Sequence, residues 1–444
     1  MKRNLVFAFV LIITSSVIVP AQELMPGNRF SETEQATYRL YLEKKWDSLI
    51  AAGKTGRREG LDYYYLHARL GRAYFETGRY RQAVKAFRQA LKHNAADAFS
   101  QEYLYYALLY SGQNTAADAV AGKMPHGMQK QLFNKSLPFF LAFEAGPLLS
   151  DGRQKAQKAN MPENGHYAET RLPSDGHYLH TGAGFRVGRG SGLYAGFSQT
   201  GLEYHQRAFL ADSTLFRKQL PFRANEVFLQ WSWAPETKWE IVPALKFARN
   251  SISRGIVNYS SQTNQYLFTT DTSRYNDWLG SLTLVYKPGL FSISLNTTMF
   301  EIFDSLALQT GISAVFYPRG NLNLLIKTGF IFNHSQGIDN LAASFDIGGK
   351  ISKGVWAEAG IMTGDLRNLA LNGGMVVYNT GYMISTRAGF LLLIQLSQHL
   401  RLSANYQFLA CHDKLYVLQL PNLWESQNVY FTKHTITGGI KWTL

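Results

Sequence analysis

The chain ends in the stretch His434-Thr-Ile-Thr-Gly-Gly-Ile-Lys-Trp-Thr-Leu444, in which apolar and polar residues alternate up to the final position. Successive side chains of a β-strand point to opposite faces, so this stretch has two faces of different character. One face carries threonines, Gly439 and Lys441, and the other carries Ile436, Gly438, Ile440, Trp442 and Leu444. A strand with one face for lipid and one for a polar interior is the unit of a transmembrane β-barrel.

This ending resembles the terminal strand of Gram-negative outer-membrane proteins, which commonly finish on an aromatic residue. Here Leu444 is terminal and Trp442 supplies the aromatic ring. The resemblance implies that the barrel closes with its last strand. It also implies that Gly438, Ile440, Trp442 and Leu444 form the signal that the barrel-assembly machinery reads.

The amino terminus has the pattern of a secretory signal peptide. Lys2 and Arg3 precede an apolar run over 5–19, and Val19-Pro-Ala21 fits a cleavage site with small residues. A membrane anchor is the alternative, but the run is shorter than the roughly 20 residues that a spanning helix needs. We therefore expect residues 1–21 to be removed on export.

Composition limits what the mature chain can be. Aromatic residues make up 14% and charged residues 17%. No later apolar run reaches the length of a spanning helix, so we expect strands to cross the membrane. Cys411 is the single cysteine and cannot form an intramolecular disulfide. The formal net charge of +14 is spread without a basic run, so no nucleic-acid surface is predicted.

Residues 22–135 are rich in Ala, Leu, Tyr, Arg and Gln, which predicts a helical domain. Within it one segment resembles a tetratricopeptide repeat, in which two antiparallel helices interlock through small and large residues at fixed spacing. The packing residues that carry the resemblance are Leu70, Gly71, Tyr74, Gly78, Tyr80, Ala83, Phe87 and Ala90.

A second, degenerate unit follows, with Leu104, Leu108, Gly112 and Ala117. A third, weaker unit precedes the first one, around Trp46 and Leu49. About three units are the minimum for a repeat stack to bury its core, so we expect the domain to dock on something else. The resemblance implies a surface that binds a periplasmic protein or an exported polymer. A spacer or a cap on the barrel is the equally weighted alternative.

From 136 to 444 the apolar pattern changes from a helical period to the period of two that is typical of strands. Six short turns rich in Gly, Pro, Asn and Ser each join two successive strand-like runs, as hairpin connections do. They lie at 188–192, 235–237, 287–289, 318–321, 352–354 and 397–399.

The other connections are predicted to be mostly long loops. Counting the runs between turns predicts an antiparallel barrel of 14 strands, so the overall fold is a helical repeat domain followed by a transmembrane β-barrel. An even strand count returns the chain to its starting side, and short turns are typical of the periplasmic rim. The repeat domain is therefore expected in the periplasm and the barrel in the outer membrane. Long loops are expected at 148–176, 204–221, 250–275, 364–384 and 411–427, and shorter ones near 302–304 and 334–337.

One face of several strands is expected to meet lipid, with Trp and Tyr near the strand ends forming an aromatic girdle. The opposite face carries charges of both signs. Either these charges line a polar conduit that selects cargo, or they pair across strands and fill the lumen, for example Lys327 with Asp346 or Lys246 with Glu240. The predicted lumen-facing charges are Glu144, Arg186, Glu226, Glu240, Lys246, Lys327, Asp346, Glu358, Arg387, Arg401 and Lys441.

No residue set points to an enzyme, a cofactor or a metal. His166, His177 and His180 follow no recognised ligand spacing, and loop histidines are usually only solvated. The layout resembles the exopolysaccharide exporters of the cellulose and poly-N-acetylglucosamine type, although those chains are longer and carry more repeats. Two functions remain open: a channel or export conduit whose repeats recruit partners or cargo, and an anchor for a protein-binding repeat domain.

Overall fold

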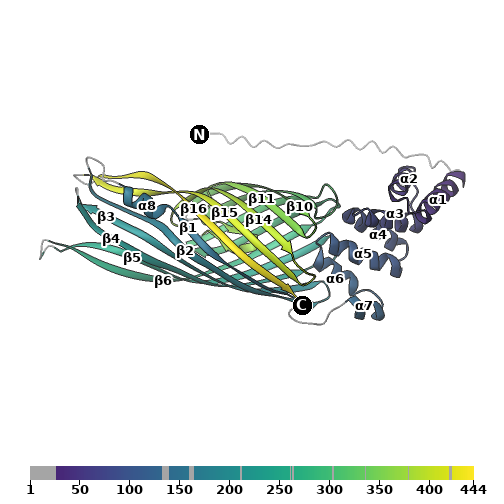
Figure 1. Ribbon diagram of the computed structural model, residues 1–444, viewed down its shortest axis with the longest axis horizontal. Helices are drawn as coiled ribbons and strands as arrows, with labels where there is room; N and C mark the ends of the chain where they lie inside the picture. The colour runs from purple at the N-terminus through teal and green to yellow at the C-terminus, as the bar shows by residue number, and fades with distance from the viewer. Residues whose placement is uncertain are drawn as a thin grey trace, which may run out of the picture.

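The computed structural model describes residues 27–132, 140–159, 165–210, 213–260, 262, 265–302, 305–335, 337–378, 380–419 and 423–444. The expected signal peptide lies outside these residues. Helices occupy the amino-terminal part and strands the rest, and the helices lie at one end of a long barrel (Figure 1). The helices before the barrel are α1 (Gly27–Leu42), α2 (Trp46–Arg58), α3 (Tyr64–Glu76), α4 (Tyr80–His93), α5 (Ala98–Tyr110), α6 (Asn114–Ala121) and α7 (His126–Leu132).

Close packing between α3 and α4 explains the spacing of small and large residues in this repeat domain, which we define as residues 27–132. Gly71 in α3 lies against Phe87 in α4, and a Cβ atom at position 71 would lie 2.7 Å from the phenyl ring. Leu70, Ala83 and Phe87 are fully or almost fully buried. Because only a glycine lets the ring approach so closely, the sequence pattern sets the distance between the two helices.

The turns between paired helices use glycine in the left-handed region, with φ of 70° at Gly78 and 75° at Gly112. Tyr74 and Tyr80 are half-buried beside the first of these turns, and Ala90 is fully buried. None of the described helices combines the length and apolarity needed to cross a membrane.

Replacing Phe87 by alanine should remove the main wedge of the repeat domain. Loss of a buried phenylalanine costs about 3–5 kcal/mol, so the helices should unfold at clearly lower urea concentration. The helical circular-dichroism signal of the detergent-solubilised protein measures this. Lys85 is exposed on the same helix, and Lys85→Ala should change the free energy of unfolding by no more than about 0.5 kcal/mol. Equal urea midpoints for the two variants would contradict the packing role of Phe87.

Fourteen antiparallel strands of the described residues form a closed barrel. The first and last strands pair, with Phe140 opposite Thr443 and Phe143 opposite Ile440, so the final strand closes the barrel as the sequence predicts. The strands are β1 (Phe140–Ser150), β2 (Gly165–Gly188), β3 (Ser191–Leu210), β4 (Ser213–Trp233), β5 (Trp239–Ser260), β6 (Gln265–Tyr286), β7 (Phe291–Ile302), β8 (Ser305–Phe316), β9 (Leu324–Ser335), β10 (Ile338–Ser352), β11 (Val355–Gly364), β14 (Met383–Gln395), β15 (Leu400–Gln419) and β16 (Leu423–Thr443).

The six predicted short turns are all present, and they lie at the end of the barrel that we call the short-turn end. The prediction of long loops at 148–176, 204–221, 250–275 and 411–427 is largely wrong. Most of these residues continue the strands as hydrogen-bonded hairpins, except that α8 (Gly152–Lys158) follows β1. For example, β5 and β6 stay paired from Trp239–Tyr286 as far as Ser260–Gln265.

Unequal strand length follows from these hairpins. A tilted strand of about 9–11 residues spans a bilayer, whereas β6 has 22 residues and β11 has 10. The long parts of β2–β6, β15 and β16 therefore form a collar beyond the shorter strands (Figure 1). Beyond the bilayer a strand needs no apolar face for lipid, although Ala168, Phe209, Leu415 and Val417 form a buried cluster inside the collar. This is why their sequences look like loops.

The predicted loop at 364–384 does not extend away from the barrel. Residues 365–382, which we call the lumenal segment, contain the short strands β12 (Ala370–Leu371) and β13 (Val376–Val377) and the 3₁₀ turn η1 (Asn372–Gly374). The segment leaves β11 and reaches β5, β6 and β7 on the far side of the barrel before returning to β14. It therefore crosses the interior.

The outer face of the barrel is apolar, as expected for a surface in lipid. Trp231 stacks on Trp233, and Trp239 packs on Tyr286, in an aromatic girdle at the short-turn end. Trp442 lies at the same end and is exposed. Exposed apolar residues on the predicted lipid faces include Leu141, Phe143, Val227, Leu229, Leu341, Phe345, Ile347 and Phe390. Phe139, which the alternation of the first strand also assigns to the lipid face, lies outside the described residues.

Candidate functional site: the barrel lumen and its short-turn end

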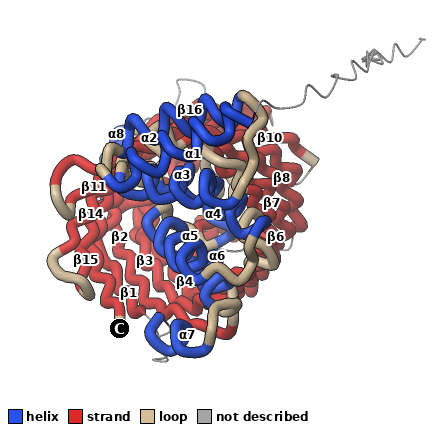
Figure 2. The backbone as a smooth tube through the Cα atoms, turned by 90° about the vertical axis from the view of Figure 1, so that its right-hand side faces the viewer, coloured by secondary structure: helices blue, strands red, loops and turns tan. Residues whose placement is uncertain are grey.

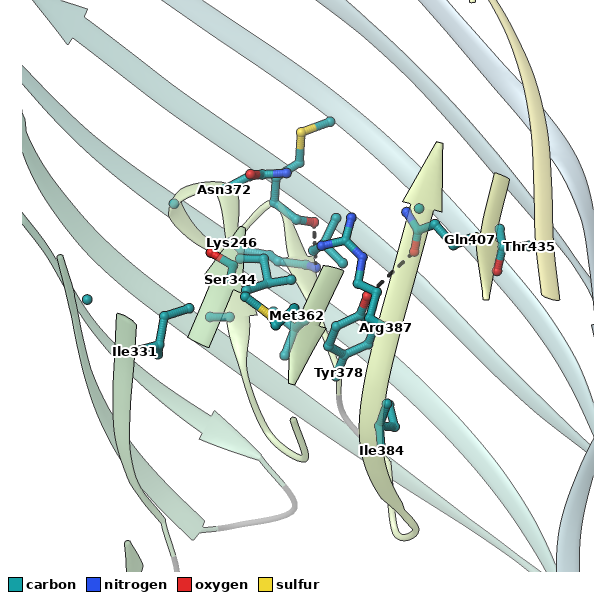
Figure 3. A pocket seen from close by; sticks show the side chains of 18 of the residues that line it. Lys246, Ile331, Ser344, Met362, Asn372, Tyr378, Ile384, Arg387, Gln407 and Thr435 are labelled. Atoms are coloured by element: carbon teal, nitrogen blue, oxygen red, sulfur yellow. Dashed lines mark hydrogen bonds between the residues drawn. The ribbon is translucent and has the colours of Figure 1, made fainter. Parts of the chain in front are cut away.

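A cavity of about 1100 Å³ lies inside the barrel beside the lumenal segment. Its wall combines charged and amide side chains from strands all around the barrel with the segment itself. Figure 3 shows Lys246, Arg387 and Gln407 from the wall near Asn372 and Tyr378 of the segment. The interior is therefore neither an open tube nor a solid core.

Polar wall residues hold the lumenal segment by its backbone. The side-chain amide of Gln309 in β8 makes two hydrogen bonds to the backbone of Ala370. Its nitrogen donates to the Ala370 carbonyl at 2.7 Å, and its oxygen accepts from the Ala370 N–H at 2.9 Å. The hydroxyl of Ser281 donates to the Gly373 carbonyl at 2.7 Å. These contacts satisfy backbone groups that would be costly to bury unpaired.

An apolar cluster surrounds the return of the segment towards β14. Leu366, Leu369, Tyr382 and Ile384 are almost fully buried there. The Tyr382 ring also accepts an edge-on contact from Phe431 at a centroid distance of 5.1 Å. This cluster lies in the part of the barrel away from the repeat domain (Figure 1).

Lys246 connects the wall to the segment. Its ammonium lies 2.8 Å from the Glu226 carboxylate and donates to the Met375 carbonyl at 3.2 Å (Figure 3). The suggested pair of Lys246 with Glu240 is wrong, because Glu240 instead pairs with Lys287 at 2.5 Å. Strand register places Glu226, not Glu240, beside Lys246 on the same face.

The other predicted charges divide between the cavity and the short-turn end. Lys327 lies opposite Asp346 in the strand register, and both line the cavity with Glu358, Arg387 and Glu144. Glu144 accepts a hydrogen bond from the Thr437 hydroxyl. At the short-turn end, Arg186 faces the repeat domain, Arg401 lies opposite Lys441, and the Lys441 ammonium lies over the Phe140 ring.

The repeat domain docks on the short-turn end, and its helices lie in front of the barrel opening in the view along the barrel (Figure 2). Arg81 makes the densest set of contacts. Its guanidinium donates to the carbonyls of Gly289 and Phe291 at 3.3 and 3.2 Å and to the Ser292 hydroxyl at 3.2 Å. The same group stacks over the Tyr317 ring at 3.5 Å. Burial lowers the pKa of Arg81.

Further contacts extend the interface across other turns. The Asn321 amide donates to the Gly78 carbonyl at 2.8 Å. Arg88 donates to the Thr237 carbonyl at 2.5 Å, and burial lowers its pKa to about 10, which leaves it charged at pH 7.

The α6 helix adds polar contacts of its own. The Thr115 hydroxyl donates to Glu240 at 3.0 Å. Asp118 pairs with Arg186 at 3.4 Å; burial raises the pKa of this carboxyl group, and the charge of Arg186 opposes the rise. Docking thus uses three of the predicted short turns, whereas the sequence pattern did not single out the contacting helix residues Arg81, Arg88 and Thr115.

The candidate histidines of the sequence do not form a cluster. His180 is buried and bonds Ser198 and Tyr194 at 2.8 and 2.6 Å. His177 lies in β2, and the His166 side chain lies outside the description. Within the described residues, a group that sequence reasoning missed comes together instead in the repeat domain: Asp62, His67 and His93. The helix pairing of one repeat unit could have revealed it, because the start of the first helix lies beside the end of the second.

Comparison with known proteins identifies the helical repeat. Residues 64–97 match the family model for tetratricopeptide repeats, which covers α3 and α4. The search of curated protein sequences gives no match.

Several solved barrels are similar in structure. The Pseudomonas putida toluene transporter TodX is 10% identical, with a TM-score of 0.45 over 74% of this chain and 92% of that chain. A Pseudomonas aeruginosa FadL homologue is 9% identical, with a TM-score of 0.46 over 76% and 94%. Identities and TM-scores this low do not indicate a cargo for this chain. The strand order, the apolar outer face and the repeat match show a chain that joins a tetratricopeptide-repeat domain to a fourteen-stranded barrel of the outer-membrane type.

Proposed function

We propose that this protein is a gated conduit of the outer membrane, in which the lumenal segment is the gate. The observation that carries the proposal is the cavity of about 1100 Å³ beside the segment, with Lys327, Asp346, Glu358 and Arg387 in its wall. A cavity of this size exceeds the usual 300–1,000 Å³ of a small-ligand site. A barrel that served only as an anchor would have no need for a charged chamber.

The anchorage of the segment also supports a gate. Gln309, Ser281 and Lys246 hold it by side-chain contacts to its backbone, with no covalent bond to the opposite wall. Each such hydrogen bond contributes only about 0.5–1.5 kcal/mol, or about 1.5–3 kcal/mol when one group is charged. A partner or cargo releases the segment when its preference for the open state offsets these hydrogen bonds together with the burial of Leu366, Leu369 and Tyr382.

The repeat domain supplies the second element of the proposal. It docks at the short-turn end, and short turns are typical of the periplasmic rim. The helices therefore face the periplasm and receive a protein or a cargo before it enters the barrel. No catalytic step is part of this function.

An anchoring role is the second candidate. The apolar cluster around Leu366, Leu369, Tyr382 and Ile384 favours it, because packing of this kind holds the lumen closed. In that case the barrel would only present the repeat domain to a periplasmic partner. The two candidates differ in whether the lumen ever conducts.

The test is planar-bilayer conductance of the full-length Lys246→Met variant. Removing the charged contact to Met375 should raise the ratio of open to closed events about 10- to 100-fold, as expected for a charge-assisted hydrogen bond. The double variant Lys246→Met/Glu226→Gln leaves no unpaired Glu226 charge and should give the same rise. Lys287→Met removes a similar buried lysine that does not touch the segment and should not raise the ratio. If both Lys246 variants fold but show no conductance, the proposal that the lumenal segment is a gate is wrong.

A further inference from the structure

Three side chains with metal-ligating atoms converge at one end of the repeat domain. Asp62 lies in the connection between α2 and α3, His67 in the first turn of α3, and His93 at the last residue of α4. Antiparallel pairing of α3 and α4 brings these positions together. The opposite end of the same helix pair, at Gly78, contacts the barrel. The group therefore lies away from the docking interface.

The ligating atoms are already close to one another. His67 Nε2 lies 2.5 Å and His93 Nε2 lies 3.1 Å from the same oxygen of Asp62, and all three atoms lie within 4.8 Å. The two imidazole rings are stacked at 5.7 Å with an interplanar angle of 17°. Both rings thus present the same nitrogen to one point.

Burial differs among the three residues in a way that suits a binding site. The His67 side chain is 2% exposed, whereas those of Asp62 and His93 are 68% and 35% exposed. An ion pair with so exposed a carboxylate adds little stability by itself. Hydrogen bonding to Asp62 therefore does not account for a buried histidine whose Nε2 is aimed outward.

We propose that Asp62, His67 and His93 bind a divalent transition-metal ion, with Zn²⁺ as the best fit. Two imidazole nitrogens and one carboxylate oxygen match the ligands of zinc. Zinc bonds of about 2.0–2.2 Å in tetrahedral geometry place ligand atoms roughly 3.3–3.5 Å apart. The two carboxylate–imidazole distances, 2.5 and 3.1 Å, are somewhat shorter than this value, and the exposed Asp62 and His93 can move apart around the buried His67.

The fourth position of this site faces solvent, because Asp62 and His93 are its exposed members. Water or a side chain of a binding partner completes the tetrahedron there. The charge of Arg57 acts on His67 and opposes a cation, and the Asp62 carboxylate offsets it. The bound ion joins the α2–α3 connection to both helices of the repeat and so stabilises the native state by mass action.

The test uses untagged, metal-stripped, full-length protein in detergent. Calorimetry with Zn²⁺ should show one equivalent bound, and Co²⁺ should give the visible absorption bands of a tetrahedral site. Loss of a group that only supports a metal ligand costs about 10- to 100-fold in affinity, so Asp62→Ala and His93→Ala should each lose at least ~100-fold. Both positions are partly or fully exposed, so the fold should survive, which circular dichroism checks.

His334→Ala is the matched control. His334 lies 2.6 Å from Asp339 in an exposed pair with no third ligating side chain among the described residues, so this variant should bind Zn²⁺ like the unaltered protein. Ca²⁺ should not compete, because it requires six to eight oxygen ligands. Absence of binding to the unaltered protein, or a Zn²⁺ affinity of Asp62→Ala and His93→Ala equal to that of the unaltered protein, would overturn the proposal.

Discussion

Replacing residues 366–381 by a short Gly-Ser turn is expected to convert a closed barrel into one with resolved, stepwise conductance in planar bilayers. The removed residues cross the lumen and carry the apolar groups Leu366, Leu369 and Leu371, which are buried inside the barrel. Without them the charged cavity would be open to solvent at the end of the barrel away from the repeat domain. Among single changes to this protein, we expect this one to have the largest effect on solute flux.

The barrel should fold without the segment. Its strands pair along their full hydrogen-bond ladders, and β11 pairs directly with β14 from Val355–Ile394 to Thr363–Thr386. His334→Ala, a change at an exposed position that leaves the lumenal segment in place, serves as the control. If the segment deletion folds but passes no current, the interior is closed by its own wall and the anchoring role gains support.

Arg81→Ala is expected to release the repeat domain from the short-turn end. The guanidinium contacts Gly289, Phe291, Ser292 and Tyr317 at once. Central arginines of this kind contribute about 2–4 kcal/mol to an interface, so the undocked population should rise roughly 30- to 1,000-fold. Hydrogen exchange should then accelerate in α4 and in the turn at 317–322.

Arg79→Ala provides the comparison for this result. Arg79 lies two residues away and pairs with the exposed Asp47 within the repeat domain at 3.0 Å. Its loss should leave exchange at the barrel turns unchanged. Equal exchange in the two variants would show that Arg81 does not hold the interface.

The sequence predicts the framework of the fold well because its main signals are local. Alternation at 434–444 identifies a two-faced strand, and the spacing of Gly71 and Phe87 identifies two interlocked helices. The six short turns follow from Gly, Pro, Asn and Ser at fixed places, and they give the correct strand number. Each of these signals depends on residues within one or two neighbouring elements.

The sequence-based predictions are wrong where the same residue pattern has a different structure outside the membrane or inside the barrel. Polar residues such as those of 269–273 suggest a loop, yet they lie in β6 and pair with β5 above the membrane. The apolar residues Leu366, Leu369 and Tyr382 are unusual for an exposed loop, and that signal could have indicated the lumenal segment. The partners Glu226 and Met375 of Lys246 depend on long-range register, which a single sequence does not reveal.

In the orientation proposed above, the collar faces the cell exterior, and this has a consequence for the survival of the protein. Proteases cut most readily at exposed loop tips and at locally unfolded backbone. In β5 and β6 the backbone remains paired from Trp239–Tyr286 to Ser260–Gln265, far beyond the length that a bilayer requires. Among the described residues of the collar, paired strands offer a protease little locally unfolded backbone, so this part of the molecule is expected to resist cleavage without the help of a disulfide.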